Sequence, residues 1–193
     1  KPYVRVGQNN ELVIKRVLDA GAEGIIVPMV NSKKDALRAV ASIKYPPQGS
    51  RGVGLGRAQN YGFNFEEYAL SVDRDIAIIV QIEHIEAIHN LEEILSVDQI
   101  DASIIGPYDL SGSIGKPGQF EDDDVKEAIL KYENISKKFD KPFGYHIIKP
   151  DHQLLIDKIK KGYSFLGFSL DTIFLGTKVR EEMDSIKRFN LWK

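Results

Sequence analysis

Cysteine is absent from this 193-residue sequence. The chain therefore has no disulfide, no thiolate nucleophile and no cysteine-ligated zinc site. No apolar run approaches the roughly 20 residues that span a bilayer, and no signal-peptide pattern opens the sequence. The formal net charge is only −2, so there is no basic field to attract nucleic acid or anionic lipid. We expect a cytoplasmic protein with no nucleic-acid and no membrane partner.

The sequence does contain a regular alternation of short apolar runs and helical patterns. The apolar runs predict strands, and these are Tyr3–Val6, Gly24–Val30, Ile76–Ile82, Ala102–Ile105, Phe143–Ile148 and Phe165–Leu170. Apolar residues at helical spacing predict the main helices, which are Glu11–Ala20, Lys33–Ile43, Ile85–Leu95, Asp122–Phe139, His152–Lys161 and Thr172–Phe189. No linker or low-complexity tract interrupts the pattern, so residues 1–193 are interpreted as one domain.

Repeated strand–helix units predict a parallel sheet, either open or closed into a barrel. The glycine-rich stretch Arg51–Gly56 resembles a phosphate loop, but it follows a Pro-Pro turn and lacks the Lys-Ser/Thr ending of a P-loop. Polar residues spread over several strand ends favour a barrel. The fold class predicted is α/β, a (β/α)8 TIM barrel. Because such a barrel has eight strands, we expect its first two βα units to lie upstream of this chain.

Two carboxylates follow predicted strands at corresponding positions. Glu83 comes directly after Ile76–Ile82, and Asp109 lies in the loop after Ala102–Ile105. Each acid alone is explained equally well as the N-cap of the next helix. Neighbouring parallel strands lie roughly 4.8 Å apart, so two acids at the same end of adjacent strands converge. The pair therefore predicts a cation site at the carboxyl end of the sheet, where α/β barrels carry their chemistry.

Six blocks of sequence, taken in order, resemble the HpcH/HpaI aldolase family of the pyruvate/phosphoenolpyruvate-binding barrel superfamily. The resemblance covers most of the chain and keeps both the order and the spacing of the blocks. The blocks are Val4-Arg5, residues 14–22 (IKRVLDAGA), residues 24–30 (GIIVPMV), residues 45–54 (YPPQGSRGVG), Gln81-Ile82-Glu83 and Gly106-Pro107-Tyr108-Asp109-Leu110-Ser111.

The resemblance implies a divalent-metal-dependent class II aldolase, which cleaves or forms 2-oxo acids through a pyruvate enolate. It implies that Glu83 and Asp109 are ligands of Mg²⁺ or Mn²⁺, with Co²⁺ as a further option. Arg5 would contact the keto oxygen of the substrate. In the Gly106 motif, the backbone N–H groups of Tyr108 and Asp109 would receive the substrate carboxylate. Asp19 would partner the catalytic histidine of the family.

The residue types agree with this chemistry. Two carboxylates without a cysteine or histidine partner form an oxygen-rich site, which suits Mg²⁺ or Mn²⁺ better than structural zinc. Its open positions would let a 2-oxo acid chelate the ion, which stabilises the charge of a developing enolate. The guanidinium of Arg5 adds a fixed positive charge. No lysine is needed as a Schiff-base nucleophile.

The sequence departs from the family pattern at two points. The family's general base is a histidine on an earlier strand, and no such motif precedes Arg5. Three of the four histidines, His84, His89 and His152, fit solvated helical positions. His146 closes a predicted strand, where a structural role and a functional role are both open. At Tyr108 the family carries a small residue, so the phenol either narrows the pocket or points away.

Two further features have open interpretations. Arg51 and Arg57 flank the glycine-rich loop and either cover an anionic substrate or pair with nearby acids. The helix 172–189 carries an apolar stripe, which packs on the core or, as the family's exchanged last helix suggests, on a neighbouring subunit. The resemblance accordingly implies a homo-oligomer, a trimer or a hexamer.

Function is predicted as a carbon–carbon lyase that uses pyruvate and an aldehyde. One alternative is a citrate-lyase-type enzyme acting on acyl-CoA thioesters, although no cluster of basic residues predicts a site for the CoA phosphates. Another is a catalytically silent module that retains the metal pocket. The sequence does not name the aldehyde, the metal or the direction of the reaction.

Overall fold

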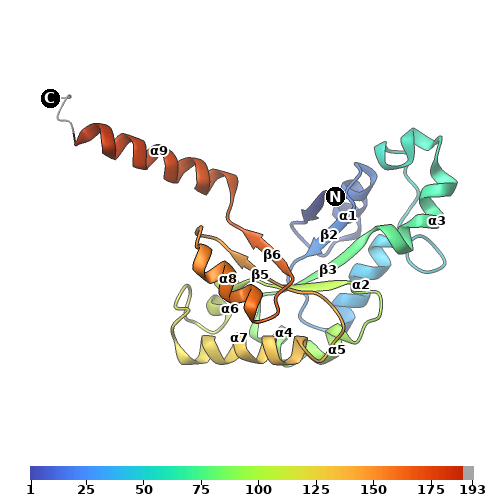
Figure 1. The fold of residues 1–193 in the computed structure, drawn as a ribbon. Coiled ribbons are helices and arrows are strands. Elements are labelled where there is room, and N and C mark those ends of the chain that lie inside the picture. Colours follow the sequence, from blue (N-terminus) through green and yellow to red (C-terminus); the bar gives the residue numbers. More distant parts are fainter. Residues whose placement is uncertain (189–193) are drawn as a thin grey trace.

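The computed structural model describes residues 1–188 and contains one curled parallel sheet with helices packed on its convex side (Figure 1). Six strands pair in the order of the sequence, and each pair is parallel. They are β1 (Tyr3–Arg5), β2 (Gly24–Val27), β3 (Ala77–Ile82), β4 (Ala102–Ile105), β5 (Phe143–Ile147) and β6 (Phe165–Phe168). The expected α/β fold with a parallel sheet is confirmed as a curled half-barrel.

The helices alternate with the strands. They are α1 (Glu11–Asp19), α2 (Lys33–Ile43), α3 (Phe65–Asp75), α4 (Ile85–His89), α5 (Leu91–Leu95), α6 (Pro107–Ser113), α7 (Asp123–Ser136), α8 (His152–Lys160) and α9 (Asp171–Lys187), together with the 3₁₀ helix η1 (Arg57–Gly62). None of the helices described up to residue 188 is long and apolar enough to cross a membrane.

Local sequence sets the ends of these elements. The Asn10 side chain caps α1 by accepting from two backbone N–H groups, and Gly21 turns the chain after it with a φ of 103°. The predicted strand Gly24–Val30 ends early at Val27, because Pro28 has no N–H for the sheet and Met29 has a φ of 52°. The predicted helix Ile85–Leu95 is divided at Asn90.

The apolar core lies between the convex face of the sheet and the helices. It includes Ile14 and Leu18 of α1, Val80 and Ile82 of β3, and Leu91 of α5, all fully buried. A smaller cluster of Ile79, Ala102 and Ile104, with Ile26 and Phe165 packed against it, lies on the concave face. Residues on adjacent strands that are register partners point to the same face. Alternate strand residues therefore line the concave side, where the site described below lies.

The last helix, α9, stands apart from the rest of the molecule. It runs away from the sheet as a single extended rod (Figure 1), and none of its residues is buried. The prediction of a helix over 172–189 is met over Asp171–Lys187, and residue 189 lies outside the described part of the chain.

Candidate active site

The carboxyl ends of the strands bring together three of the residues singled out from the sequence. Arg5 ends β1, Glu83 directly follows β3, and Asp109 lies in the first turn of α6, after β4. Arg5 and Asp109 line a cavity of about 460 Å³, and Glu83 lies beside it at 2% exposure. The cavity is lined by Arg5, Ile26, Gln81, Ile104, Ile105, Asp109, His146, Phe165, Leu166, Gly167 and Leu170.

The carboxylate of Glu83 is held by groups from two strand ends. Its Oε1 accepts the backbone N–H of Met29 at 2.9 Å, and its Oε2 accepts Nε2 of Gln81 at 2.5 Å. One guanidinium nitrogen of Arg5 lies 3.9 Å from Oε1. Each oxygen thus has a defined direction before any ligand binds, as the hydrogen bonds around metal-binding carboxylates commonly provide.

Burial makes the negative charge of Glu83 costly. It raises the pKa of this carboxyl, the hydrogen bond from Met29 lowers it, and the charge of Asp109 raises it again, with a net shift upward. A second carboxylate beside a buried one disfavours ionisation of the pair. A cation between the two groups would remove that repulsion, so the electrostatics of the site favour a bound positive charge.

Gln81 is a site residue that sequence reasoning missed. Its Oε1 accepts Nε of Arg5 at 3.2 Å, while its Nε2 donates to Glu83. One amide therefore fixes both the guanidinium and the carboxylate. A signal was available, because strand alternation places Gln81 on the same face as the buried Ile79, where a polar side chain is unusual.

Gly106 leaves space for the carboxylate. A Cβ built on this residue would lie 2.9 Å from Nε2 of Gln81 and 3.1 Å from Oε2 of Glu83. The next residue, Pro107, begins α6, and the first N–H groups of a helix have no acceptor within it. The ring of Tyr108 packs edge-on against Phe120, with 4.8 Å between centroids. It lines a smaller neighbouring cavity, so it does not narrow the one that holds Asp109.

The structure does not place Asp19 with these residues. Asp19 ends α1, and its Oδ1 accepts from Arg51 at 2.7 Å while its Oδ2 accepts from Lys15 at 2.5 Å. Arg51 is fully buried and stacks on the rings of Tyr45 and Tyr68. Of the two interpretations of Arg51, pairing with a nearby acid is therefore the one observed.

The four histidines differ in their surroundings. His84 caps α4 by accepting the N–H of Glu86 at 3.2 Å, and the ring of His152, at the start of α8, lies 5.6 Å from that of Phe168. His89 lies in a groove beside α7. His146 alone of these lines the cavity with Arg5 and Asp109.

The ionisable groups suit a hard cation. In the part of the chain that the structure describes, no group of three or more histidine, cysteine or acidic side chains gathers to hold a metal. The two carboxylates supply oxygen donors only, the ligand type that Mg²⁺ and Mn²⁺ prefer, and leave the other positions to water and substrate. The donor set thus fits a divalent ion with open coordination positions.

Comparison with known proteins identifies the family. The sequence model described as HpcH/HpaI aldolase/citrate lyase matches residues 1–172. A hydroxypyruvate/pyruvate aldolase of Sagittula stellata is 40% identical over 175 residues, 90% of this chain and 68% of that protein. A pyruvate aldolase of Rhizobium etli is 39% identical with the same coverage. The crystal structure of an HpcH/HpaI aldolase/citrate lyase family protein from Burkholderia cenocepacia aligns with a TM-score of 0.90 at 28% identity, over 96% of this chain and 73% of that one.

The chain therefore belongs to the HpcH/HpaI aldolase/citrate lyase family. The resemblance drawn from the sequence blocks is confirmed, and so is the prediction of an enzyme that acts on carbon–carbon bonds, an aldolase-type lyase.

Proposed function

We propose that this protein is a divalent-metal-dependent class II aldolase that forms or cleaves a carbon–carbon bond of a 2-oxo acid through a pyruvate enolate. The observation that carries the proposal is the convergence of Glu83 and Asp109 beside Arg5 at one cavity. The relatives named pyruvate aldolases support pyruvate as the 2-oxo acid and an aldehyde as its partner.

Glu83 and Asp109 would hold the ion, with Mg²⁺ or Mn²⁺ favoured by their oxygen donors and Co²⁺ a further option. When bound, a divalent cation acts as a Lewis acid on the 2-oxo group. The hydrogen bonds from Met29 and Gln81 orient the Glu83 carboxylate toward this task. Met29 and Gln81 therefore fix the orientation in which the Glu83 carboxylate would meet the ion, beside Asp109.

Arg5 would stabilise the oxygen that gains negative charge as the enolate forms. Its guanidinium is half-exposed and is fixed at one side by Gln81. A positive group set in place before the reaction needs no reorganisation when charge develops. The substrate carboxylate would accept from the backbone N–H groups of Tyr108 and Asp109, in the turn that follows Gly106. The 2-oxo acid would thus be held at its keto oxygen by Arg5 and at its carboxylate by these backbone N–H groups.

The catalytic role of Asp19 stays a prediction. Within this chain its carboxylate is already held by Arg51 and Lys15, which anchors the glycine-rich loop against α1. We further propose that the curled sheet is part of a (β/α)8 barrel, as the structural match over 73% of a family member supports.

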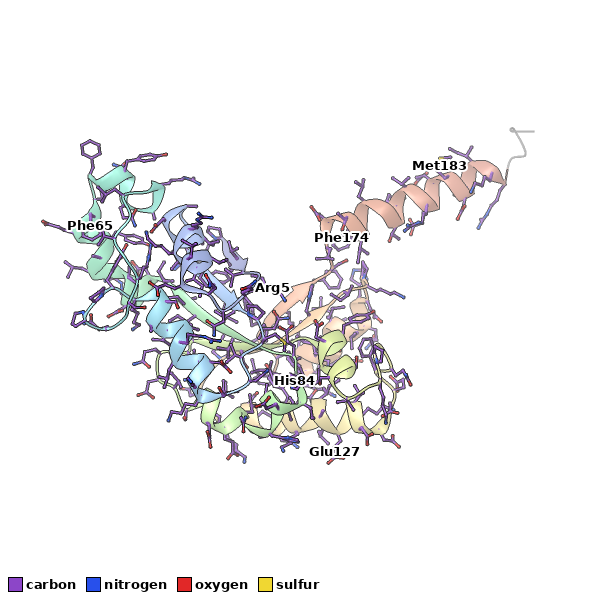
Figure 2. All side chains as sticks on the ribbon, turned by 180° about the vertical axis from the view of Figure 1, so that it is seen from behind. Arg5, Phe65, His84, Glu127, Phe174 and Met183 are labelled. Atoms are coloured by element: carbon purple, nitrogen blue, oxygen red, sulfur yellow. The ribbon has the colours of Figure 1, made fainter. Side chains whose placement is uncertain are left out.

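We also propose that α9 packs on a neighbouring subunit of a homo-oligomer, a trimer or a hexamer. Exposed apolar side chains recur at helical spacing along it, at Leu175, Val179, Met183 and Ile186, and Met183 stands clear of the sheet (Figure 2). Leu175 is 68% and Val179 52% exposed. A contiguous apolar surface of this kind marks an interaction site.

Proton exchange at C3 of pyruvate in D₂O, followed by NMR, tests the proposed function in the full-length protein. This reaction requires enolate formation but no aldehyde, so the aldehyde need not be known. We expect exchange that depends on Mn²⁺ or Mg²⁺, stops on adding a chelator and is lost in Glu83→Gln. The exposed Glu93→Gln serves as control. A folded, metal-loaded protein that exchanges no proton contradicts the aldolase proposal and favours the acyl-CoA lyase or the silent module.

A further inference from the structure

His146 faces the same cavity as the proposed metal site but takes no part in the contacts described so far. It is the register partner of Gly167 on β6, and Gly144, two residues earlier, pairs with Ile104 of the concave face. Because residues two apart on a strand share a face, the imidazole projects into the concave side. There it lines the cavity with Arg5 and Asp109.

Gly167 makes room for this ring. A Cβ built on Gly167 would lie 2.9 Å from Cδ2 and 3.6 Å from Nε2 of His146. The φ of Gly167 is not positive, so its backbone does not require glycine. The missing side chain has a spatial consequence instead: the imidazole rests directly on the β6 backbone. The absence of a side chain at Gly167 therefore provides the space that the His146 ring occupies.

The ring nitrogens are free to bind a ligand. Within residues 1–188 no hydrogen bond or ion pair engages the His146 side chain. The ring is partly exposed. Neutral imidazole carries one donor and one acceptor, and both kinds of group suit a hydroxyl.

His146 also stands at the junction of two cavities. The larger one contains Arg5 and Asp109, and a smaller one of about 140 Å³ contains Tyr108 and Lys149. In the proposed reaction the 2-oxo acid occupies the Arg5–Asp109 side, which leaves the His146 side of the larger cavity for the aldehyde. The wall on that side is otherwise apolar, formed by residues such as Phe165, Leu166 and Leu170.

We infer that His146 determines the aldehyde specificity of this enzyme: its imidazole hydrogen-bonds the hydroxyl group of a short hydroxylated aldehyde. The inference rests on the proposed aldolase function and names the substrate class at its aldehyde side. A site built to bind a substrate hydroxyl discriminates strongly against an analogue that lacks it, because its own polar group then stays unpaired.

Two aldehydes of similar size test this inference in the full-length, Mn²⁺-loaded protein. Glycolaldehyde carries a hydroxyl where propanal carries a methyl group. For addition of pyruvate, we expect His146→Leu to lower kcat/KM about tenfold with glycolaldehyde and less than about threefold with propanal. His146→Gln, which retains a donor and an acceptor, should recover part of the loss. His152 is exposed, and His152→Leu should leave the ratio of kcat/KM with glycolaldehyde to kcat/KM with propanal unchanged.

Gly167→Ala provides an independent variant, since its methyl group would displace the imidazole. Like His146→Leu, it should lower the ratio of kcat/KM with glycolaldehyde to kcat/KM with propanal. Pyruvate C3 exchange is measured on every variant and should stay within about twofold of wild type, which reports an intact 2-oxo acid side. Equal losses for both aldehydes, or no loss, with exchange retained would overturn this inference alone. Absence of exchange in the wild type would overturn the proposed function, and the inference with it.

Discussion

The backbone N–H of Met29 donates a 2.9 Å hydrogen bond to Oε1 of Glu83, across 54 residues of sequence. Met29 adopts a φ of 52° at this point, a left-handed conformation that costs a non-glycine residue roughly 1–2 kcal/mol. Strained backbone of this kind is commonly found at functional sites, where the surrounding structure maintains it. Here the strained residue orients the buried carboxylate.

Substitution of Met29 tests this relationship. Glycine adopts positive φ without steric cost, so Met29→Gly should retain the site, with a free energy of unfolding within about 1 kcal/mol of wild type. A β-branched residue is more strongly disfavoured there than methionine, so Met29→Val should unfold more easily than both the wild type and Met29→Gly, and should bind Mn²⁺ more weakly. Thermal unfolding and Mn²⁺ titration measure the two effects. Equal thermal stability and equal Mn²⁺ affinity of Met29→Gly and Met29→Val would contradict the backbone strain assigned to Met29.

A methyl group at position 106 should impair the site without unfolding the protein. In Gly106→Ala the added Cβ would meet the side chains of Gln81 and Glu83 at about 3 Å, so the carboxylate must move. We expect at least a tenfold loss of pyruvate exchange, since a misplaced group of this kind costs one to two orders of magnitude. Gly112→Ala, where nothing lies within 4 Å of the new Cβ, is the matched control. Similar pyruvate exchange rates for Gly106→Ala and Gly112→Ala would contradict the close packing of Gly106 against Gln81 and Glu83.

The ion pair of Asp19 and Arg51 should govern stability and its acid dependence. Burial raises the pKa of Asp19, but the hydrogen bonds and charges of Arg51 and Lys15 outweigh this effect and hold it below 3.8. A carboxyl with a depressed folded pKa contributes stability above its unfolded pKa and loses it as the pH falls through the folded value. The wild type should therefore lose this contribution below about pH 4.

Asp19→Asn isolates that contribution. It leaves the guanidinium of Arg51, which is 0% exposed, without its charge partner, and should lower the free energy of unfolding at neutral pH by about 3 kcal/mol. The difference from wild type should shrink toward acid pH. Urea unfolding at several pH values measures this, with the exposed Asp98→Asn as control. A difference that does not change with pH would contradict the role of the ionised carboxylate.

The apolar stripe of α9 should hold the oligomer together. Val179→Glu combined with Met183→Glu places two charges on this stripe, whose side chains are about half-exposed in the single chain. We expect the species seen by light scattering to shift to monomers, because a buried unpaired charge in an interface is costly. Thr177→Glu lies about 200° around the helix from Val179 and should leave the assembly unchanged. An unchanged mass for the double variant would contradict the proposed packing.

Part of this site could be predicted from the sequence because parallel strands share one carboxyl edge. That rule places Glu83 and Asp109 near one another from their positions after apolar runs, whereas Arg5 was expected beside them only from the family resemblance. In the structure Arg5 and Asp109 line one cavity, and a guanidinium nitrogen of Arg5 lies 3.9 Å from Glu83. The contacts of Met29 and Gly106 could not be predicted, because they depend on atomic distances between distant segments.

The role of Arg51 could not be predicted from the sequence. The sequence left a substrate cover and an ion pair equally open, because nothing local reveals whether a loop arginine is buried. The structure decides it through Asp19 and the rings of Tyr45 and Tyr68. The strand ends at Val27 and the helix break at Asn90 were missed for a similar reason, since apolar periodicity continues past both points.

Binding of Mn²⁺ followed by electron paramagnetic resonance tests the central claim most directly, namely that Glu83 and Asp109 hold the ion together. In the full-length wild type we expect one Mn²⁺ per chain. Glu83→Gln and Asp109→Asn should each weaken binding by at least tenfold, while Glu93→Gln should bind as the wild type does. Binding that is unaffected by either substitution at Glu83 or Asp109 would contradict the account.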